Sequence, residues 1–161
     1  MIIRFWGTRG SLPTALTAAD IREKVTAALL ASRGKDLRSE GQIRKFVQEE
    51  LPFHVAGTCG GSTPCVEMVT GSEEYLVFDG GSGLRNLGQR IMQSGSKSKT
   101  IHIFLSHLHY DHIQGIPFFT PAYIPGNKII FHGGHDNLKE SLSRHMEAPY
   151  FPINIDTMGD R

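Results

Sequence analysis

The sequence predicts an α+β protein, because two kinds of hydrophobic pattern alternate along it. Short runs of β-branched and aromatic residues bounded by glycine-rich turns, which are typical of strands, recur between residues 2 and 132. Segments whose apolar residues are three or four positions apart, which are typical of amphipathic helices, lie between them. With 161 residues, 39% of them hydrophobic and 20% charged, the chain has the length and composition of one globular domain.

Charge and hydropathy exclude several classes of protein. The 17 basic and 16 acidic residues nearly cancel, so bulk charge gives no reason to expect a polyanionic partner. The chain has no apolar run long enough to span a membrane, and its start lacks a basic region followed by a long apolar one. We therefore expect a cytoplasmic protein without a membrane span, in which Cys59 and Cys65 are reduced thiols.

The N-terminal part predicts one strand followed by a pair of helices. The strand covers residues 2–6 and ends in a glycine-rich turn, where Arg9 is either an anion contact or a solvated side chain. The helices begin at two capping boxes, Thr17-x-x-Asp20 and Ser39-x-x-Gln42. This pair, at about residues 17–52, is expected to be a helical hairpin inserted into the series of strands.

Nothing in the helical pair predicts catalysis. Its apolar residues form stripes at helical spacing, with Ile21, Val25 and Leu29 on the first helix and Ile43, Phe46 and Val47 on the second. Such stripes are more often core than a groove for a partner, and we expect them to be buried.

A hairpin of two strands, residues 64–69 and 75–78, is expected next, followed by a helix with Leu84, Leu87 and Ile91 on one side. The turn between strand and helix is rich in glycine, as in nucleotide-binding folds, but Asn86 stands where the third glycine of that fingerprint is required. We therefore reject a nucleotide-binding loop and expect Asp79 to be a buried strand-end carboxylate that supports neighbouring loops.

The densest group of chemical side chains follows an apolar strand at residues 101–105. It has the pattern His-x-His-x-Asp-His, from His107 to His112. Imidazole and carboxylate are the usual ligands of zinc and similar ions. In extended chain His107 and His109 project to the same side and can bind one ion, while a turn would direct Asp111 and His112 to a second.

Beyond this motif the sequence predicts supporting structure. Residues 113–123 are apolar and interrupted by proline, which suits a rigid loop or short helix forming one wall of a substrate pocket. A strand is expected at 128–132, then a helix capped by Asp136. Four other histidines lie in no recognisable ligand pair and are expected to be polar surface, pocket or core residues: His102, His132, His135 and His145.

Taken together, these motifs resemble those of the metallo-β-lactamase-fold hydrolases, in particular the phosphodiesterase-like branch with ribonuclease Z-type and cyclic-phosphate phosphodiesterase relatives. The matching stretches are Phe5 to Ser11, Gly61 to Glu67, Phe78 to Leu84 and Leu105 to Gly115. The resemblance implies the N-terminal half of a four-layer αββα sandwich, with residues 1–161 as a partial domain.

The resemblance also implies site residues and a reaction. His107 and His109 would bind the first metal, Asp111 and His112 the second, and Asp79 would be a supporting residue behind the ligands. Two divalent ions about 3.5–4 Å apart lower the pKa of a bridging water, whose hydroxide attacks a phosphodiester. Asp111 would also orient that nucleophile as a catalytic residue. Zinc is the expected metal, with manganese or iron as alternatives, and the substrate would be a small-molecule or nucleotide phosphodiester.

This chain departs from the family pattern, because the family has three further ligands downstream of residue 161. Two ligands per ion fall short of the three that catalytic zinc normally has, so we expect partial or absent metal occupancy and an inactive isolated chain. Three accounts remain open: an N-terminal portion of a longer metallohydrolase, an enzyme completed by another chain or a homodimer, and a non-enzymatic metal-binding or interaction fragment. A thioester or lactam is the alternative substrate.

Overall fold

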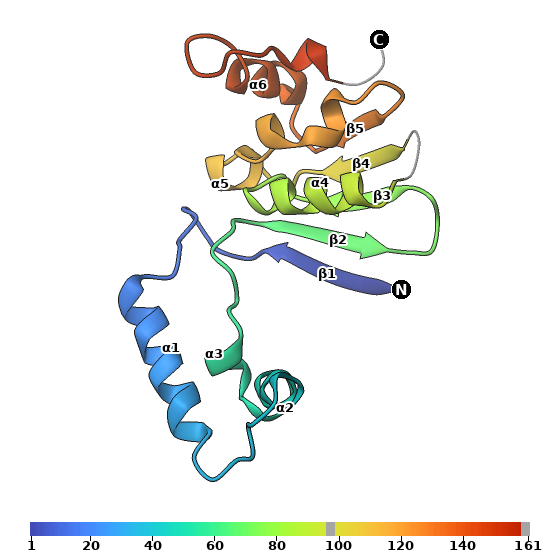
Figure 1. Cartoon of the computed structure of the whole chain (residues 1–161). Coiled ribbons are helices and arrows are strands. Elements are labelled where there is room, and N and C mark those ends of the chain that lie inside the picture. The colour runs from blue at the N-terminus through green and yellow to red at the C-terminus, as the bar shows by residue number, and fades with distance from the viewer. Residues whose placement is uncertain (96–98, 159–161) are drawn as a thin grey trace. The chain divides into compact units, whose positions relative to one another are not determined.

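The computed structural model describes residues 1–95 and 99–158, and it contains one mixed β-sheet of five strands in the order β1-β2-β3-β4-β5 (Figure 1). The strands β1, β2 and β3 pair antiparallel, and β3, β4 and β5 pair parallel. Their bounds are β1 Ile2–Gly7, β2 Cys65–Val69, β3 Tyr75–Phe78, β4 Thr100–Phe104 and β5 Lys128–His132. The predicted α+β class and the predicted hairpin of β2 and β3 are therefore confirmed.

This pairing brings the carboxyl ends of four strands to one edge of the sheet. Because β1 and β3 are both antiparallel to β2, they run in the same direction as β4 and β5. We call this edge the carboxyl edge, and define it by the five segments that lie there: residues 8–14, 61–64, 79–82, 105–116 and 133–137. Sequence motifs that are far apart in the chain meet at this edge.

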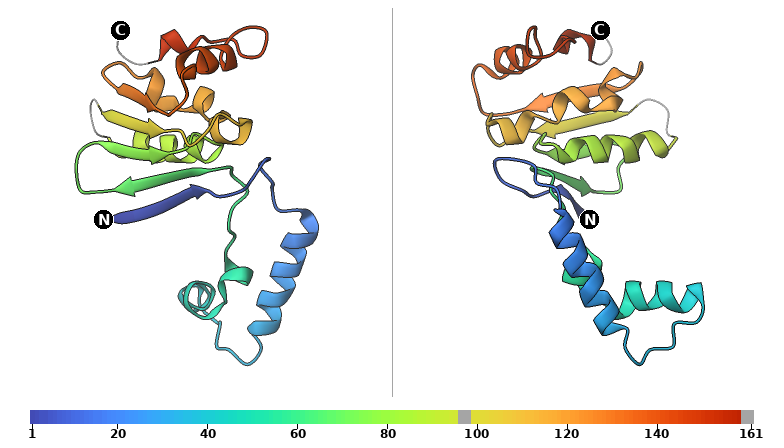
Figure 2. Two further views of the ribbon diagram at one scale, coloured as in Figure 1. Left: turned by 180° about the vertical axis from the view of Figure 1, so that it is seen from behind. Right: turned by 60° about the vertical axis from the view of Figure 1, so that its left-hand side comes forward.

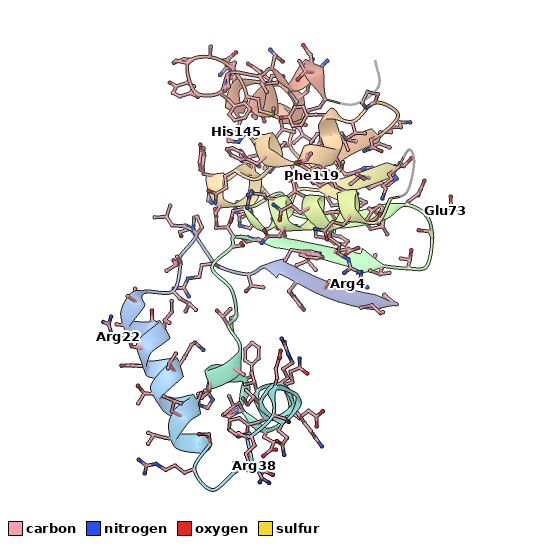
Figure 3. The ribbon with its side chains drawn as sticks, viewed as in Figure 1. Arg4, Arg22, Arg38, Glu73, Phe119 and His145 are labelled. Carbon is pink, nitrogen blue, oxygen red and sulfur yellow. The ribbon has the colours of Figure 1, made fainter. Side chains whose placement is uncertain are left out.

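One face of the sheet is covered by helix α4, Gly83–Gln93 (Figure 1). The predicted stripe of Leu84, Leu87 and Ile91 is buried, and it packs on inward-facing strand residues such as Val77 and Ile103. Gly88 lets the helix approach Phe119, since a Cβ atom there would stand 3.0 Å from the Phe119 ring. Phe119 is itself buried in this core (Figure 3).

The opposite face of the sheet, seen from behind in Figure 2, is partly open. Cross-strand pairing places Phe5, Phe78 and Phe104 on this face, where Phe5 is 69% exposed and Phe78 39%. Phe104 stacks on both Phe78 and His132. His102 Nδ1 lies 2.9 Å from His132 Nε2, so the two rings form a hydrogen-bonded pair.

Short helices complete the compact unit that contains the sheet, made by residues 1–14 and 61–161. They are α5 Tyr110–Ile113, the 3₁₀ turns η2 Ile116–Phe118, η3 Thr120–Tyr123 and η4 Ile155–Thr157, and α6 Leu138–His145. Of the rigid loop or short helix expected at residues 113–123, the structure has the helical form, as the two turns η2 and η3. The predicted cap of α6 is wrong: Asn137, not Asp136, precedes the helix, and its side chain makes no capping hydrogen bond. The sequence also predicts a polar linker at residues 97–100, of which 97 and 98 lie outside the described residues and Thr100 is the first residue of β4.

Residues 15–60 form a second compact unit, separate from the unit made by residues 1–14 and 61–161. It contains α1 Ala18–Ala31, α2 Glu40–Lys45, the π-helical turn η1 Phe46–Glu50 and α3 Phe53–Ala56. Both predicted capping boxes are confirmed. Lys24 donates to the carbonyl oxygens of His54 and Gly57, and so ties α1 to the end of α3.

The predicted burial of the helical stripes in this unit is wrong except at one position. Phe46 is buried, but Ile21, Val25 and Leu29 on α1 are each more than half exposed. The physical reason is that α1 contacts only the short α3 extensively: its half-buried residues are Lys24, Ala27 and Ala28, and its larger apolar residues stay exposed. No helix in the described part of the chain is long and apolar enough to cross a membrane.

Candidate metal centre

The histidine motif lies at the carboxyl edge, in the segment that joins β4 to α5. The backbone at His109 is extended, with φ −64° and ψ 152°, and α5 starts at the next residue. The His107 ring centre is 4.5 Å from that of His109 and 4.0 Å from that of His112. The strand end and the following helical turn therefore bring three imidazoles together.

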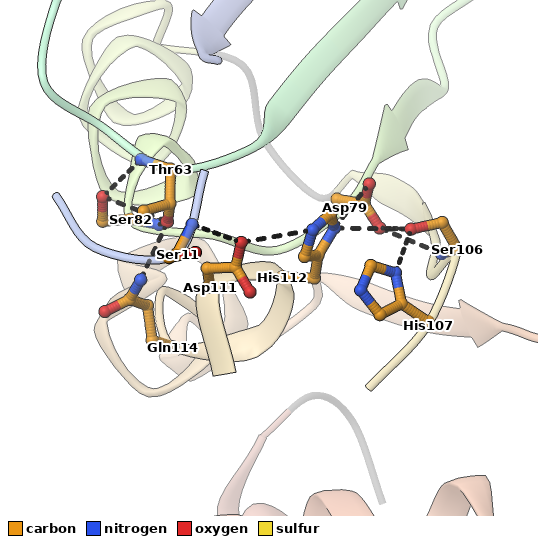
Figure 4. A network of polar contacts seen from close by, with 9 residues as sticks. All are labelled: Ser11, Thr63, Asp79, Ser82, Ser106, His107, Asp111, His112 and Gln114. Atoms are coloured by element: carbon orange, nitrogen blue, oxygen red, sulfur yellow. Dashed lines mark hydrogen bonds and ion pairs between the residues drawn. The ribbon is translucent and has the colours of Figure 1, made fainter. Parts of the chain in front are cut away.

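Asp79 supports this group from the end of the neighbouring strand. Its Oδ1 accepts hydrogen bonds from the Ser106 backbone N–H at 2.9 Å and the Ser106 hydroxyl at 2.8 Å. Its Oδ2 lies 3.0 Å from Nδ1 of His112 (Figure 4). The backbone of Asp79 has a left-handed φ of 61°, which a residue other than glycine adopts at a cost of about 1–3 kcal/mol. Such strain is typical of functional sites.

The Ser106 hydroxyl connects the carboxylate to two rings. It lies 3.0 Å from Nδ1 of His107 and 3.3 Å from Nδ1 of His112 (Figure 4). With Nδ1 held in this way, Nε2 of each ring is the nitrogen available to a metal ion, as in many carboxylate–histidine–metal sites. Nε2 of His112 lies 3.4 Å from Asp111 Oδ2, so these two atoms are close enough to bind one ion together.

Asp111 is held by the turn after β1. Its Oδ2 accepts the backbone N–H of Ser11 at 2.9 Å, and Ser11 itself has a left-handed φ of 59° (Figure 4). This hydrogen bond, together with the nearby His112, holds the pKa of the Asp111 carboxyl below its usual range. The carboxylate is therefore in the charged form that a metal ion requires.

A second polar network fixes α5 against the loop after β3. Gln114 donates to the Thr63 hydroxyl at 2.9 Å, and the Ser82 backbone N–H donates to the same oxygen at 2.7 Å (Figure 4). Thr63 is fully buried. A Cβ atom at Gly115 would lie 2.0 Å from the Gly81 carbonyl oxygen, so the backbones touch here. These contacts hold the ligand-bearing turn in place.

The structure thus brings His107, His109, Asp111 and His112 together and places Asp79 behind them. Sequence reasoning missed Ser106 and Ser11. Ser106 precedes the motif directly, and a hydroxyl beside a histidine pair could have indicated its role. For Ser11 no local signal exists, because its contact with Asp111 spans 100 positions.

The later histidines lie apart from this group. His132 belongs to the pair with His102 on the open face. His145 packs edge-on against the Tyr110 ring at 5.2 Å, and its buried Nε2 has no hydrogen-bond partner among the described residues. Burial lowers the pKa of His145. A cavity of about 360 Å³ lies at the opposite edge of the sheet, lined by residues such as Arg4, Glu73 and Ser94.

The donor set fits a divalent metal ion in kind, because it joins imidazole nitrogens to a charged carboxylate with the Nδ1 atoms held behind. Within residues 1–95 and 99–158, however, no group of three or more His, Cys, Asp or Glu side chains is arranged to hold one ion. The centre therefore has the right ligand types and an incomplete number of them.

Comparisons with known proteins give one matching family and one similar protein. The family model described as the metallo-beta-lactamase superfamily matches residues 60–145. The chain is also similar to the ribonuclease Z of Haloarcula marismortui, with 30% identity over 89 residues. The match covers 52% of this chain and 28% of that protein, so the chain spans less than a third of its relative. No solved structure matches.

Proposed function

The chain belongs to the metallo-β-lactamase superfamily, and from this premise we propose that it contributes four ligands to a metal-dependent phosphodiester hydrolase. His107 and His109 would hold one ion, and Asp111 and His112 a second. In this proposal residues 1–161 are part of a metallo-β-lactamase domain with a helical insertion at about 17–52, acting in the cytoplasm.

The observation that carries the proposal is the contact of Asp79 and Ser106 with the histidines. A carboxylate 3.0 Å from His112 Nδ1 and a hydroxyl 3.0 Å from His107 Nδ1 leave both Nε2 atoms as ligands. A histidine pair that only stabilised the fold would not need the same nitrogen of both rings to be engaged. The left-handed backbone at Asp79 adds that this arrangement is kept at an energetic cost.

Two divalent ions, when bound, would supply Lewis acidity that activates water and neutralises phosphate charge. The chain's own contribution is to orient the ligands. Ser106 and Asp79 fix the histidine rings, while the Ser11 N–H keeps the Asp111 carboxylate charged and aimed at the same place as His112 Nε2. Zinc is the metal that this imidazole and carboxylate set suits best, with manganese or iron as alternatives.

A phosphodiester is preferred because the ribonuclease Z relative is named for a nuclease and because two dications neutralise a phosphate. A thioester or lactam remains the alternative within the same fold. The incomplete ligand number supports a second candidate, a metal-binding or interaction fragment without activity of its own.

The experiment compares the 161-residue chain with the longest protein that its gene encodes. Metal analysis and hydrolysis of an activated phosphodiester are measured in both. We expect about two ions and activity only in the longer protein, with activity lost in His109→Ala. If the isolated 161-residue chain hydrolyses the phosphodiester and His109→Ala abolishes this activity, the second candidate, a fragment without activity of its own, is rejected. Absence of tightly bound metal from the longer protein would reject the proposal.

A further inference from the structure

We propose that Arg9 binds the negative charge of the substrate and so makes the site select charged diesters over neutral esters. This inference rests on the proposed phosphodiester function, and it adds a specificity residue that lies outside the histidine motif. Arg9 is in the turn after β1, two residues before Ser11.

The first step is the distribution of charge along the carboxyl edge. Its five segments contain three carboxylates, on Asp79, Asp111 and Asp136, but Arg9 is the one arginine or lysine in them. Without Arg9, the aspartate, glutamate, lysine and arginine side chains of these segments would all be carboxylates. Any recognition of the substrate's negative charge by a side chain in these segments therefore depends on Arg9.

The second step is that the backbone around Arg9 is fixed relative to the ligands. The N–H groups of Thr8 and Arg9 both donate to the Ser62 carbonyl oxygen, at 3.0 and 2.9 Å. Ser11 N–H donates to Asp111 Oδ2. Arg9 thus lies on a turn that is anchored on both sides, one end of which touches a proposed metal ligand. A residue held in place in this way loses less freedom on binding a substrate.

The third step is that the guanidinium is available. The side chain is exposed, and among the described residues it forms no ion pair, whereas Arg4, Arg38, Arg44 and Arg144 each pair with a carboxylate. Arginine binds phosphate oxygens through two parallel hydrogen bonds, which suits a diester with one negative charge.

The chain offers a matched control in Arg85. It lies in the first turn of α4, just after the 79–82 segment, is also exposed, and forms no ion pair within the described residues. Its helix has its buried side on Leu84, Leu87 and Gly88, so Arg85 is on the solvent side. If only general positive charge near the edge matters, Arg9→Ala and Arg85→Ala will have equal effects.

The test uses the longest protein that the gene encodes, loaded with zinc, and two probes that differ by one charge. They are bis(p-nitrophenyl) phosphate and its neutral methyl triester. We expect Arg9→Ala to lower kcat/KM for the diester by about ten- to one-hundredfold, mainly through KM, because it removes a hydrogen bond to a charged group. Hydrolysis of the triester should be unchanged, Arg9→Lys should restore part of the loss, and Arg85→Ala should resemble the wild type.

A binding measurement separates failure of this inference from failure of the proposed function. The dissociation constant of bis(p-nitrophenyl) phosphate is measured on the metal-free protein by NMR titration, where no hydrolysis is required. A weaker affinity in Arg9→Ala than in Arg85→Ala supports the role of Arg9, even if the loaded protein does not cleave the diester. Equal affinities in the two variants, or no detectable binding to the wild type, would overturn it.

Discussion

Helices α4 and α1 both carry apolar residues at helical spacing, but only in α4 are these residues confined to one face, and the two helices also differ in what covers them. In α4, Leu84, Leu87 and Ile91 are at most 2% exposed, because the sheet and the turns η2 and η3 pack on them. In α1, by contrast, the stripe is exposed by 51, 53 and 66% at Ile21, Val25 and Leu29, respectively. Periodicity therefore predicts that a helix forms, whereas burial depends on partners elsewhere in the chain.

The largest effect that this comparison predicts comes from one substitution made in both helices. Leu87→Ala should destabilise the first unit by about 2–5 kcal/mol, because it leaves a cavity beside the sheet. Leu29→Ala should change stability by no more than about 0.5 kcal/mol, because the side chain is exposed. Urea unfolding followed by far-UV circular dichroism reports both units, which the fluorescence of the one tryptophan, Trp6 in β1, would not.

A large loss of stability in Leu29→Ala would contradict the exposed state of α1 in solution. The stripe would then be covered, and a second copy of this chain is the partner to examine first, by sedimentation of the wild type and the variant. Equal masses for the two proteins would exclude a homodimer held by this stripe.

A smaller effect comes from glycine, for which α4 and the helix α2 of the other unit predict changes in stability of opposite sign. Gly88→Ala in α4 should destabilise the chain by about 1 kcal/mol, since the new Cβ would meet the buried Phe119 and Pro121 at 3.0 and 3.1 Å. Gly41→Ala in α2 meets nothing within 4 Å and should stabilise its helix by about 0.5 kcal/mol. Thermal unfolding of both variants measures the difference. Stabilisation by Gly88→Ala would mean that the side chains of Phe119 and Pro121 move enough to make room for the new methyl group.

The difference between local patterns and contacts with distant segments explains how much of the structure the sequence predicts. The strands, the helix caps and the histidine motif are local patterns, and the structure has β5 at residues 128–132 and both capping boxes as expected. The approach of Asp79 to the motif also follows from local reasoning, because carboxyl ends of parallel neighbours such as β3 and β4 meet at one edge.

The remaining features depend on contacts between distant segments. The hydrogen bond from Ser11 to Asp111 requires β1 to run in the same direction as β4, which no short pattern encodes. The network of Gln114 with Thr63 joins residues 51 positions apart. The Asp136 cap was predicted wrongly because a local signal for a helix start is shared by neighbouring polar residues, here Asp136 and Asn137.

The smallest predicted effect concerns a half-buried titratable group, His145 at the end of α6. Burial lowers its pKa because it disfavours the charged imidazolium, so the unfolded chain binds this proton more tightly than the folded chain. The contribution of His145 to stability is therefore complete above the ordinary pKa of histidine, about 6.5, and is lost as the pH falls below that value. His145→Gln should reduce the loss of stability between about pH 7.5 and 5.

His54 in α3 provides the matched control, since it is an exposed histidine in the other unit. His54→Gln removes one histidine from the other unit, and so controls for the loss of a histidine as such. Unfolding by urea at a series of pH values measures both variants. The His145 ring is covered by contacts with Tyr110 and the Ile113 backbone, next to the ligand-bearing turn. If the stability of His145→Gln changes with pH as much as that of the wild type does, these contacts do not shield the ring from water in solution.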